Sequence, residues 1–240
     1  KAFKVAASAG NFGLANLSAT ADIPVSDTFR AKVSVMSSSV DGWVENKGPN
    51  SVGGQPAEDF NMKKQQAVRA AISWDLTEAV TIDYSYDYAD VDSTPPYFQS
   101  RSNSSKRLEA TESVLAPPFP GSFKYVLPES DMEQQGHNLT LTAQINDAMT
   151  LKSITSYREM DDHVYQNWSG TLFFATDLAY STEAFSQEFQ LIGTVGKLTY
   201  VTGLYYFSED GEKLETQYLN YDSGPDFTAG TLDDFGPIAQ

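Results

Sequence analysis

The chain has 240 residues, a formal net charge of −16, no cysteine and a mean hydropathy of −0.37. This acidity argues against general nucleic-acid binding, which requires a basic surface, and the lack of cysteine excludes disulfide frameworks and cysteine-ligated metals. No apolar run reaches the roughly 18 residues of a transmembrane helix. A transmembrane barrel is not excluded, because its alternating strands average to a polar-looking composition.

Strands are predicted wherever apolar and polar residues alternate with a period of two, which places one parity on each face of a pleated strand. The predicted strands, in chain order, are 3–9, 14–23, 29–36, 66–75, 80–88, 138–145, 149–158, 185–191 and 198–206. The clearest hairpin spans 66–88, where Ile72 and Trp74 before the turn, and Ile82 and Tyr84 after it, share one apolar face.

The connections between these strands alternate in length from the second strand onward. The turns predicted at 24–27, 77–79, 146–148 and 193–196 are short, whereas the connections 40–61, 92–133 and 161–181 are long. In an up-and-down sheet this order places all the short turns at one end and all the long connections at the other. Outer-membrane barrels have this layout, with short periplasmic turns and long extracellular loops.

The two faces of the predicted strands differ in charge. The apolar faces of the second to ninth strands carry no Lys, Arg, Asp or Glu, whereas the opposite faces carry Asp22, Arg30, Lys32, Arg69, Asp75, Asp83, Asp87, Lys152, Arg158, Glu188 and Lys197. A charge facing lipid at mid-depth costs about 2–4 kcal/mol, so an uncharged face is expected of a membrane wall. A soluble β-sandwich would also keep charge away from its core face.

Aromatic residues lie near both ends of the apolar face. Phe29, Trp74 and Tyr200 are next to short turns, and a second group follows near the long connections: Tyr86, Tyr88, Tyr157 and Tyr206. Two such bands are typical of the two interfaces of a membrane, although Tyr and Phe also favour strands in general.

With these hairpins assigned, the sequence resembles the barrel of a TonB-dependent outer-membrane receptor. The resemblance lies in the segments ANLSATADIPVSDTFRAKVSV, DGWVEN, LTEAVTIDYSYDYAD, LKSITSYRE, FSQEFQLIG and YVTGLYYFSED, in the order that the family has them. It implies an antiparallel barrel of roughly 22 strands, plugged by an N-terminal domain. It further implies a receptor that imports a scarce nutrient with energy from the TonB complex of the inner membrane.

The chain is expected to be the N-terminal part of such a barrel, over residues 1–240. Neither a signal peptide, a plug domain nor an energy-coupling box is recognised in it, and nine strands cannot close the family's barrel. The expected fold is therefore an all-β, antiparallel up-and-down transmembrane β-barrel, present in part. Its expected partners are outer-membrane lipid, an extracellular small-molecule ligand and, through the missing plug, the TonB complex.

No catalytic constellation, cofactor site or metal site is predicted. His163 lies beside Asp161 and Asp162, but one histidine with two sequence neighbours rarely supplies a convergent ligand set, and a solvated loop is the expected setting. Asp83 and Asp87 lie on one strand face, too far apart for the paired acids of a retaining glycosidase, and are expected to line a lumen.

The connection 92–133 is the best candidate for ligand contact, because exposed aromatic residues on a long loop can stack on a sugar or an aromatic chelate. The candidate residues are Tyr97, Phe98, Arg101, Phe119, Phe123 and Tyr125. The alternative is that these aromatic residues pack the loop against its neighbours.

The sequence therefore favours part of an outer-membrane receptor in a Gram-negative bacterium, for TonB-energised uptake of a siderophore, vitamin or oligosaccharide, and not an enzyme. Two alternatives stay open. One is a passive porin or structural barrel without plug or energy coupling. The other is a soluble β-sandwich or lectin-like binding module, which would show two packed layers of sheet.

Overall fold

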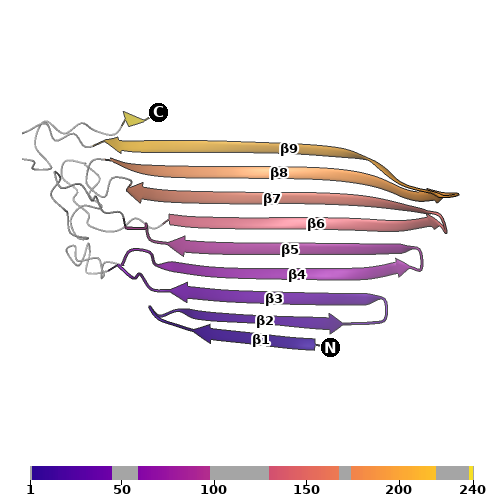
Figure 1. Cartoon of the computed structure of the whole chain (residues 1–240), viewed down its shortest axis with the longest axis horizontal. Helices are drawn as coiled ribbons and strands as arrows, with labels where there is room; N and C mark the ends of the chain where they lie inside the picture. Colours follow the sequence, from indigo (N-terminus) through magenta and orange to yellow (C-terminus); the bar gives the residue numbers. More distant parts are fainter. Residues whose placement is uncertain (1, 45–58, 98–129, 168–173, 220–237, 240) are drawn as a thin grey trace, which may run out of the picture.

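One antiparallel sheet accounts for all the regular structure that the computed structural model describes, in residues 2–44, 59–97, 130–167, 174–219 and 238–239 (Figure 1). Each strand pairs with the strands next to it in sequence, so the predicted up-and-down order is confirmed. The strands are β1 Ala2–Ala9, β2 Ala15–Pro24, β3 Phe29–Val40, β4 Lys63–Thr77, β5 Val80–Ser93, β6 Ser130–Asn146, β7 Met149–Asn167, β8 Phe174–Val195, β9 Leu198–Leu219 and β10 Ile238–Ala239.

The alternation of the sequence fixes the pairing of the strands. In the hairpin β4–β5, Ile72 is opposite Tyr84 and Val68 is opposite Tyr88, so apolar residues meet on one face. A slip of one residue would move the whole apolar set of a strand to the other face, which makes this register strongly preferred. The hairpin closes through Glu78 and Ala79, two residues between the paired Thr77 and Val80.

From β2 onward, the short turns lie at one end of the sheet and the other connections at the opposite end, as predicted (Figure 1). One prediction was wrong: residues 161–181 are not a long connection, because β7 continues to Asn167 and β8 begins at Phe174. The alternation that defined the shorter predicted strands weakens there, while the backbone pairing continues from His163–Ala179 to Asn167–Ala175. Hydrogen bonding therefore extends the strands beyond their amphipathic part.

The short turns are staggered across the sheet. Ala21, Tyr86 and Phe185 belong to one row of paired residues, and β2 ends three residues beyond this row at Pro24, whereas β8 ends ten residues beyond it at Val195. If the short turns share one rim, the strands must therefore tilt relative to the axis of a barrel. Tilt and stagger of this kind are what closure of a sheet into a barrel requires. Within the described residues the sheet is open, with β1 and β10 at its edges.

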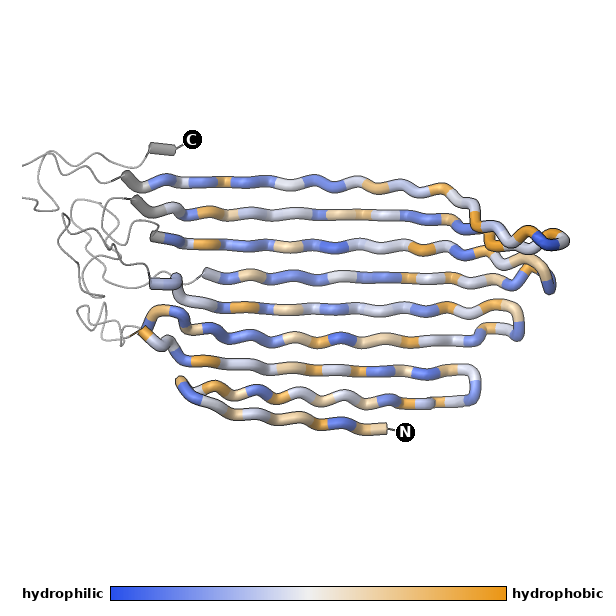
Figure 2. Tube along the Cα trace, viewed as in Figure 1, coloured by the Kyte–Doolittle hydropathy of each residue, from blue (hydrophilic) through white to orange (hydrophobic). Residues whose placement is uncertain are grey.

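Neither face of the sheet is covered by a second layer in the described part of the chain. Hydrophilic and hydrophobic residues interleave along the strands (Figure 2), and large apolar side chains stay open, with Leu204 76% and Phe3 74% exposed. A β-sandwich would bury these side chains between two sheets, so the described residues do not fit that alternative. No helix of the described chain is long and apolar enough to cross a membrane.

A small buried cluster lies at the end of the sheet where the long connections begin. Phe60 is 1% exposed and its ring is 5.2 Å from that of Tyr97, measured between centroids. The buried Thr94 joins the two chain segments, because its Oγ1 donates to the Asp59 carbonyl at 2.7 Å and accepts from the Met62 amide at 2.9 Å. These contacts fix where β4 begins and β5 ends.

Candidate functional site

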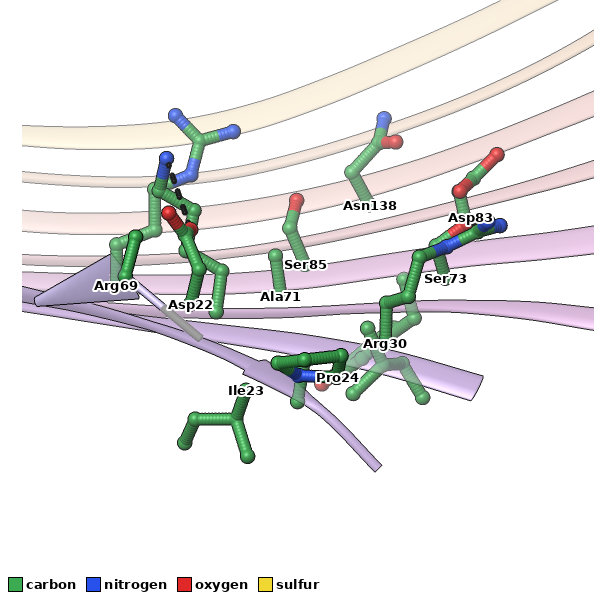
Figure 3. Close-up of a pocket in the computed structure, with 15 residues that line it drawn as sticks. Asp22, Ile23, Pro24, Arg30, Arg69, Ala71, Ser73, Asp83, Ser85 and Asn138 are labelled. Atoms are coloured by element: carbon green, nitrogen blue, oxygen red, sulfur yellow. Dashed lines mark hydrogen bonds and ion pairs between the residues drawn. The ribbon is translucent and has the colours of Figure 1, made fainter. Parts of the chain in front are cut away.

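The polar face of the sheet carries a hollow of about 660 Å³, formed mainly by β2 to β5. Its polar lining includes Arg30, Lys32, Arg69, Asp83, Ser85 and Asn138. Figure 3 shows Arg69, Ser85 and Asn138 on one side of the sheet, and Ile23 pointing to the other side. The charged parity predicted from the sequence therefore lines a concave surface, as expected of a lumen wall.

Two ion pairs cross neighbouring strands in this hollow. Arg30 Nη2 donates to Asp75 Oδ2 at 2.8 Å and to Ser73 Oγ at 3.2 Å, and Lys32 Nζ lies 3.5 Å from Asp22 Oδ1. All four charged side chains keep at least a third of their surface exposed. Pairs this exposed contribute little to stability, about 0–1 kcal/mol each, so their main effect is to hold the charged groups in place along the wall.

A third ion pair crosses two strands at once. Arg158 of β7 donates from Nη2 to Asp87 of β5 at 3.0 Å, reaching over Gly136 of the intervening strand β6. A Cβ atom at position 136 would lie 2.8 Å from Arg158 Nη2, so a larger residue there would have to shift the guanidinium from this position. The sequence identified Asp87 and Arg158 as charges of one face, but not their pairing, because that depends on the register of three strands.

Arg69 and Asp83 carry charges that form no ion pair among the described residues. Arg69 is directly opposite Asp87 in the register, but Asp87 is engaged by Arg158 from the other side. The hollow therefore presents one available cation, Arg69 of β4, and one available anion, Asp83 of β5. Ser85 lies on the same strand as Asp83, and Asn138 lies opposite Ser85 on β6. Such a surface can bind polar and charged groups.

The polar face changes character at β9. Val201, Tyr205 and Phe207 lie on this face and are 65%, 65% and 52% exposed. They pair with Ile192, Glu188 and Ser186 of β8, so the apolar patch adjoins a more polar strand. An exposed apolar patch of this kind marks a surface that contacts another molecule or another part of the same protein.

The apolar face carries an aromatic row where the uncharged part of the strands ends. Tyr86, His137, Tyr157 and Phe185 are directly paired from β5 to β8, and His137 is 4.9 Å from Tyr86 between ring centroids. The strand predicted over 138–145 begins one residue after His137, whereas in the structure His137 lies inside β6. Its Nδ1 is 2.8 Å from the Tyr84 hydroxyl. The predicted band of aromatic residues near the long connections is thus a continuous row.

Beyond this aromatic row, the same face becomes acidic. We call this region the acidic end; it comprises Asp90, Asp92, Asp131, Glu133, Glu159, Asp161, Asp177, Glu183, Asp210 and Glu212. Burial, together with the nearby carboxylates of Asp92, Glu133 and Asp131, raises the pKa of Asp90. In contrast, hydrogen bonds from Tyr157 and Gln135 lower the pKa of Glu159.

His163 lies in the acidic end, and its predicted setting in a solvated loop was wrong. It is part of β7, with Nε2 2.6 Å from Asp177 Oδ1 on β8 and Nδ1 3.4 Å from Asp131 Oδ1 on β6. Its sequence neighbour Asp162 points to the opposite face, because successive residues of a strand alternate. Among the described residues, no group of three or more His, Asp or Glu side chains could hold a metal ion.

The candidate ligand-binding residues of the long connection are described only in part. Tyr97 packs against Phe60 and is half-buried, which agrees with the alternative that these aromatic residues hold the loop in place. Phe98, Arg101, Phe119, Phe123 and Tyr125 lie outside the described residues. Their role in ligand binding stays a prediction.

The sequence matches no family model and no curated protein. The fold, however, is similar to solved structures of receptors. The siderophore receptor PiuA from Acinetobacter baumannii superposes with a TM-score of 0.63 and 12% identity over 89% of this chain. The ferric yersiniabactin uptake receptor FyuA from Yersinia pestis has a TM-score of 0.62, with 9% identity over 87% of this chain.

A third similar structure is FpvA of P. aeruginosa in complex with a heterologous pyoverdine and iron, with a TM-score of 0.58 and 14% identity over 98% of this chain. The chain spans about a third of these proteins, covering 31%, 30% and 31% of their lengths. The nine long strands therefore have the fold of part of a siderophore receptor, in agreement with the TonB-dependent receptor family that the sequence resembles.

Proposed function

We propose that this chain is part of the barrel wall of an outer-membrane receptor in a Gram-negative bacterium, and that the barrel closes with strands outside residues 1–240. The observation that carries the proposal is the separation of the two faces in a single sheet with sorted connections. Up to the aromatic row, the apolar face has no charged residue, whereas the polar face carries ion pairs and a hollow.

Strand length supports a membrane setting. β7, β8 and β9 have 19, 22 and 22 residues, about twice the ~9–11 residues that cross a bilayer. The part of each strand between the short turn and the aromatic row is sufficient to span the bilayer. The acidic end then projects beyond it on the side of the long connections, which is the extracellular side in barrels of this layout.

The apolar patch on the polar face of β9 favours a receptor with a filled lumen over a passive porin. In a water-filled lumen Val201, Tyr205 and Phe207 would be hydrated, at a cost of about 25 cal/mol for each Å² of apolar surface left uncovered. A protein domain inside the barrel would cover them. We infer that β9 faces such a domain, as the resemblance to TonB-dependent receptors implies.

The membrane setting is tested by placing single nitroxide spin labels along β5 of the full-length protein in lipid vesicles. We expect labels at Ile82 and Tyr84, on the apolar face, to be reached by oxygen dissolved in lipid. Labels at Asp83 and Ser85 should be reached by a water-soluble nickel chelate or be shielded from both probes. Equal accessibility at all four positions would contradict the proposed orientation of the sheet.

The proposed cargo is a ferric siderophore, imported with energy from the TonB complex. Similarity of fold to siderophore and ferric-yersiniabactin receptors supports this class over the vitamins and oligosaccharides that the sequence also allows. The test is growth of an iron-starved strain that has the full-length protein as its sole receptor, supplied with different ferric siderophores, with and without TonB. Growth on none of them would reject the cargo, while leaving the membrane setting to the spin-label experiment.

A further inference from the structure

His163 places one imidazole ring between two carboxylates that belong to the two neighbouring strands. Nε2 is 2.6 Å from Asp177 of β8 and Nδ1 is 3.4 Å from Asp131 of β6, so the ring bridges three strands. The side chains of His163 and Asp177 are 38% and 35% exposed, which leaves the ring in reach of solvent protons. In sequence, Asp131 and Asp177 are far from His163, and only the register brings the three together.

The two ring nitrogens cannot both bond to a carboxylate when the ring is neutral. Neutral imidazole carries one N–H, so the other nitrogen presents a lone pair, and a carboxylate accepts hydrogen bonds but donates none. One of the two contacts of His163 then becomes a repulsion between lone pairs. The protonated ring donates from Nε2 to Asp177, and its positive charge attracts both carboxylates.

The charged groups around His163 are nearly all acidic. On β7, Asp161 lies on the same face as His163. The neighbouring strand β6 supplies Glu133 in addition to Asp131. Asp92 of β5 is opposite Asp131, and Lys64 of β4 is opposite Asp92, at the far side of that strand. β8 supplies Asp177 and, further along the same face, Glu183. On β9 the nearest charged residue of this face is Glu212, opposite Ser181, whereas Asp162 of β7 lies on the other face.

We propose that His163 is a proton-dependent clamp that joins β6, β7 and β8 at the end of the sheet where the long connections begin. Histidine changes charge between about pH 5 and 8. The clamp is closed when the ring is protonated, because both carboxylates are then bound. It loosens as the pH rises, and the wider contact, to Asp131, opens first.

The clamp is located at the end of the connection that carries the candidate ligand-binding residues. Asp131 is the second residue of β6, immediately after the connection that carries the candidate ligand-binding residues, and Asp177 is the fourth residue of β8. Opening the clamp therefore frees the base of that connection, and it does so without any change in the middle of the sheet.

The test is hydrogen–deuterium exchange of the full-length protein in detergent micelles at pH 5.5 and pH 8, with each rate divided by the intrinsic chemical rate at that pH. We expect the amides at the start of β6 and of β8 to lose about two- to fivefold in protection at the higher pH, the effect of an exposed ion pair. His163→Gln should abolish this pH dependence. Asp131→Asn should abolish it at the start of β6, while the shorter contact to Asp177 keeps it at the start of β8.

His137→Gln is the matched control, since the Nδ1 of His137 bonds to a tyrosine hydroxyl rather than to a carboxylate. It should keep the pH dependence of the wild type. The proposal is overturned if the wild type shows no pH dependence, or if the dependence survives in His163→Gln. Survival of the pH dependence at the start of β6 in Asp131→Asn would also overturn it, since Asp131 is 61% exposed and its replacement does not threaten folding.

Discussion

The middle and the acidic end of the apolar face belong to the same strands and the same parity, yet they differ completely in charge. Along β6, Leu139 and Leu141 occupy the middle, and Glu133 and Asp131 occupy the acidic end. Both regions lie on the open surface of a single sheet, with Leu139 42% exposed. Among the described residues, neither region is covered by another part of the chain.

The proposed membrane setting accounts for this difference by two surrounding media. Hydrocarbon excludes charge and accepts leucine, whereas water accepts both, so a change of medium along a strand gives an abrupt change of residue type. The few polar groups in the middle fit this explanation. Gln187 donates to Ser153 at 3.0 Å and accepts from Thr155 at 2.6 Å, so its amide is satisfied without water.

The largest expected effect comes from placing the same cation in each region of one strand. Leu141→Arg should destabilise the folded barrel by about 2–4 kcal/mol, because the guanidinium would face hydrocarbon. Glu133→Arg should cost nothing and can gain about 0.2–1 kcal/mol, because it replaces a carboxylate that faces Asp90 and Asp161 directly across the strands. Folding of the full-length protein into lipid vesicles during a urea titration measures both values.

Thr140→Arg is the control for effects of arginine on β6 that are unrelated to lipid. It adds the same side chain next to Leu141 but on the polar face, opposite Asp83. A cost close to that of Leu141→Arg would mean that arginine disturbs β6 for reasons unrelated to lipid. Similar costs for Leu141→Arg and Glu133→Arg would remove the distinction between the two regions.

A smaller effect is expected where the uncharged middle of the apolar face meets the short turn between β8 and β9. Tyr200 lies across Gly193, where an added Cβ atom would be 2.4 Å from the tyrosine hydroxyl. Gly193→Val should displace the ring and cost about 1–3 kcal/mol, the usual penalty for overpacking. In a Tyr200→Ala background the same substitution should cost much less. Equal costs in both backgrounds, measured by the same titration, would show that the ring is not what the valine displaces.

The smallest effect concerns the acidic end and depends on pH. The pKa of Asp90 is raised above its usual 3.8 by burial and by neighbouring carboxylates, so ionisation costs more in the folded state than in the unfolded state. Asp90 therefore destabilises the folded state least at a pH below its folded-state pKa, where the carboxyl group is protonated. It becomes destabilising as the pH rises through the folded-state pKa. Asp90→Asn should stabilise the ends of β5 and β6 at pH 7 by about 0.2–1 kcal/mol.

At pH 3.5 the Asp90→Asn variant and the wild type should differ much less, because the aspartate is then mostly protonated. Hydrogen exchange of the amides from Ala89 to Ser93 measures this local stability at both pH values. A gain of equal size at the two pH values would assign the effect to the amide rather than to the removed charge.

The sequence determined the fold of this protein because its pattern is local. Alternation along 66–88 required a hairpin with an apolar face, and the sorted connections required an up-and-down sheet, both of which the structure confirms. The strand ends were less predictable. Residues 161–167 and 174–181 do not continue the alternation of the strands predicted beside them, so that pattern did not distinguish them from a loop, and only pairing with a neighbouring strand makes them β-structure.

The sites depended on register, which a single strand does not encode. Arg158 and Asp87 are separated by 71 residues and His163 and Asp131 by 32. The first contact needs three strands in register and the second needs two. The sequence supplied the charges and the face on which each lies. The tertiary structure alone decided the partners, since the position of one strand beside another is set by the cooperative pairing of the whole sheet.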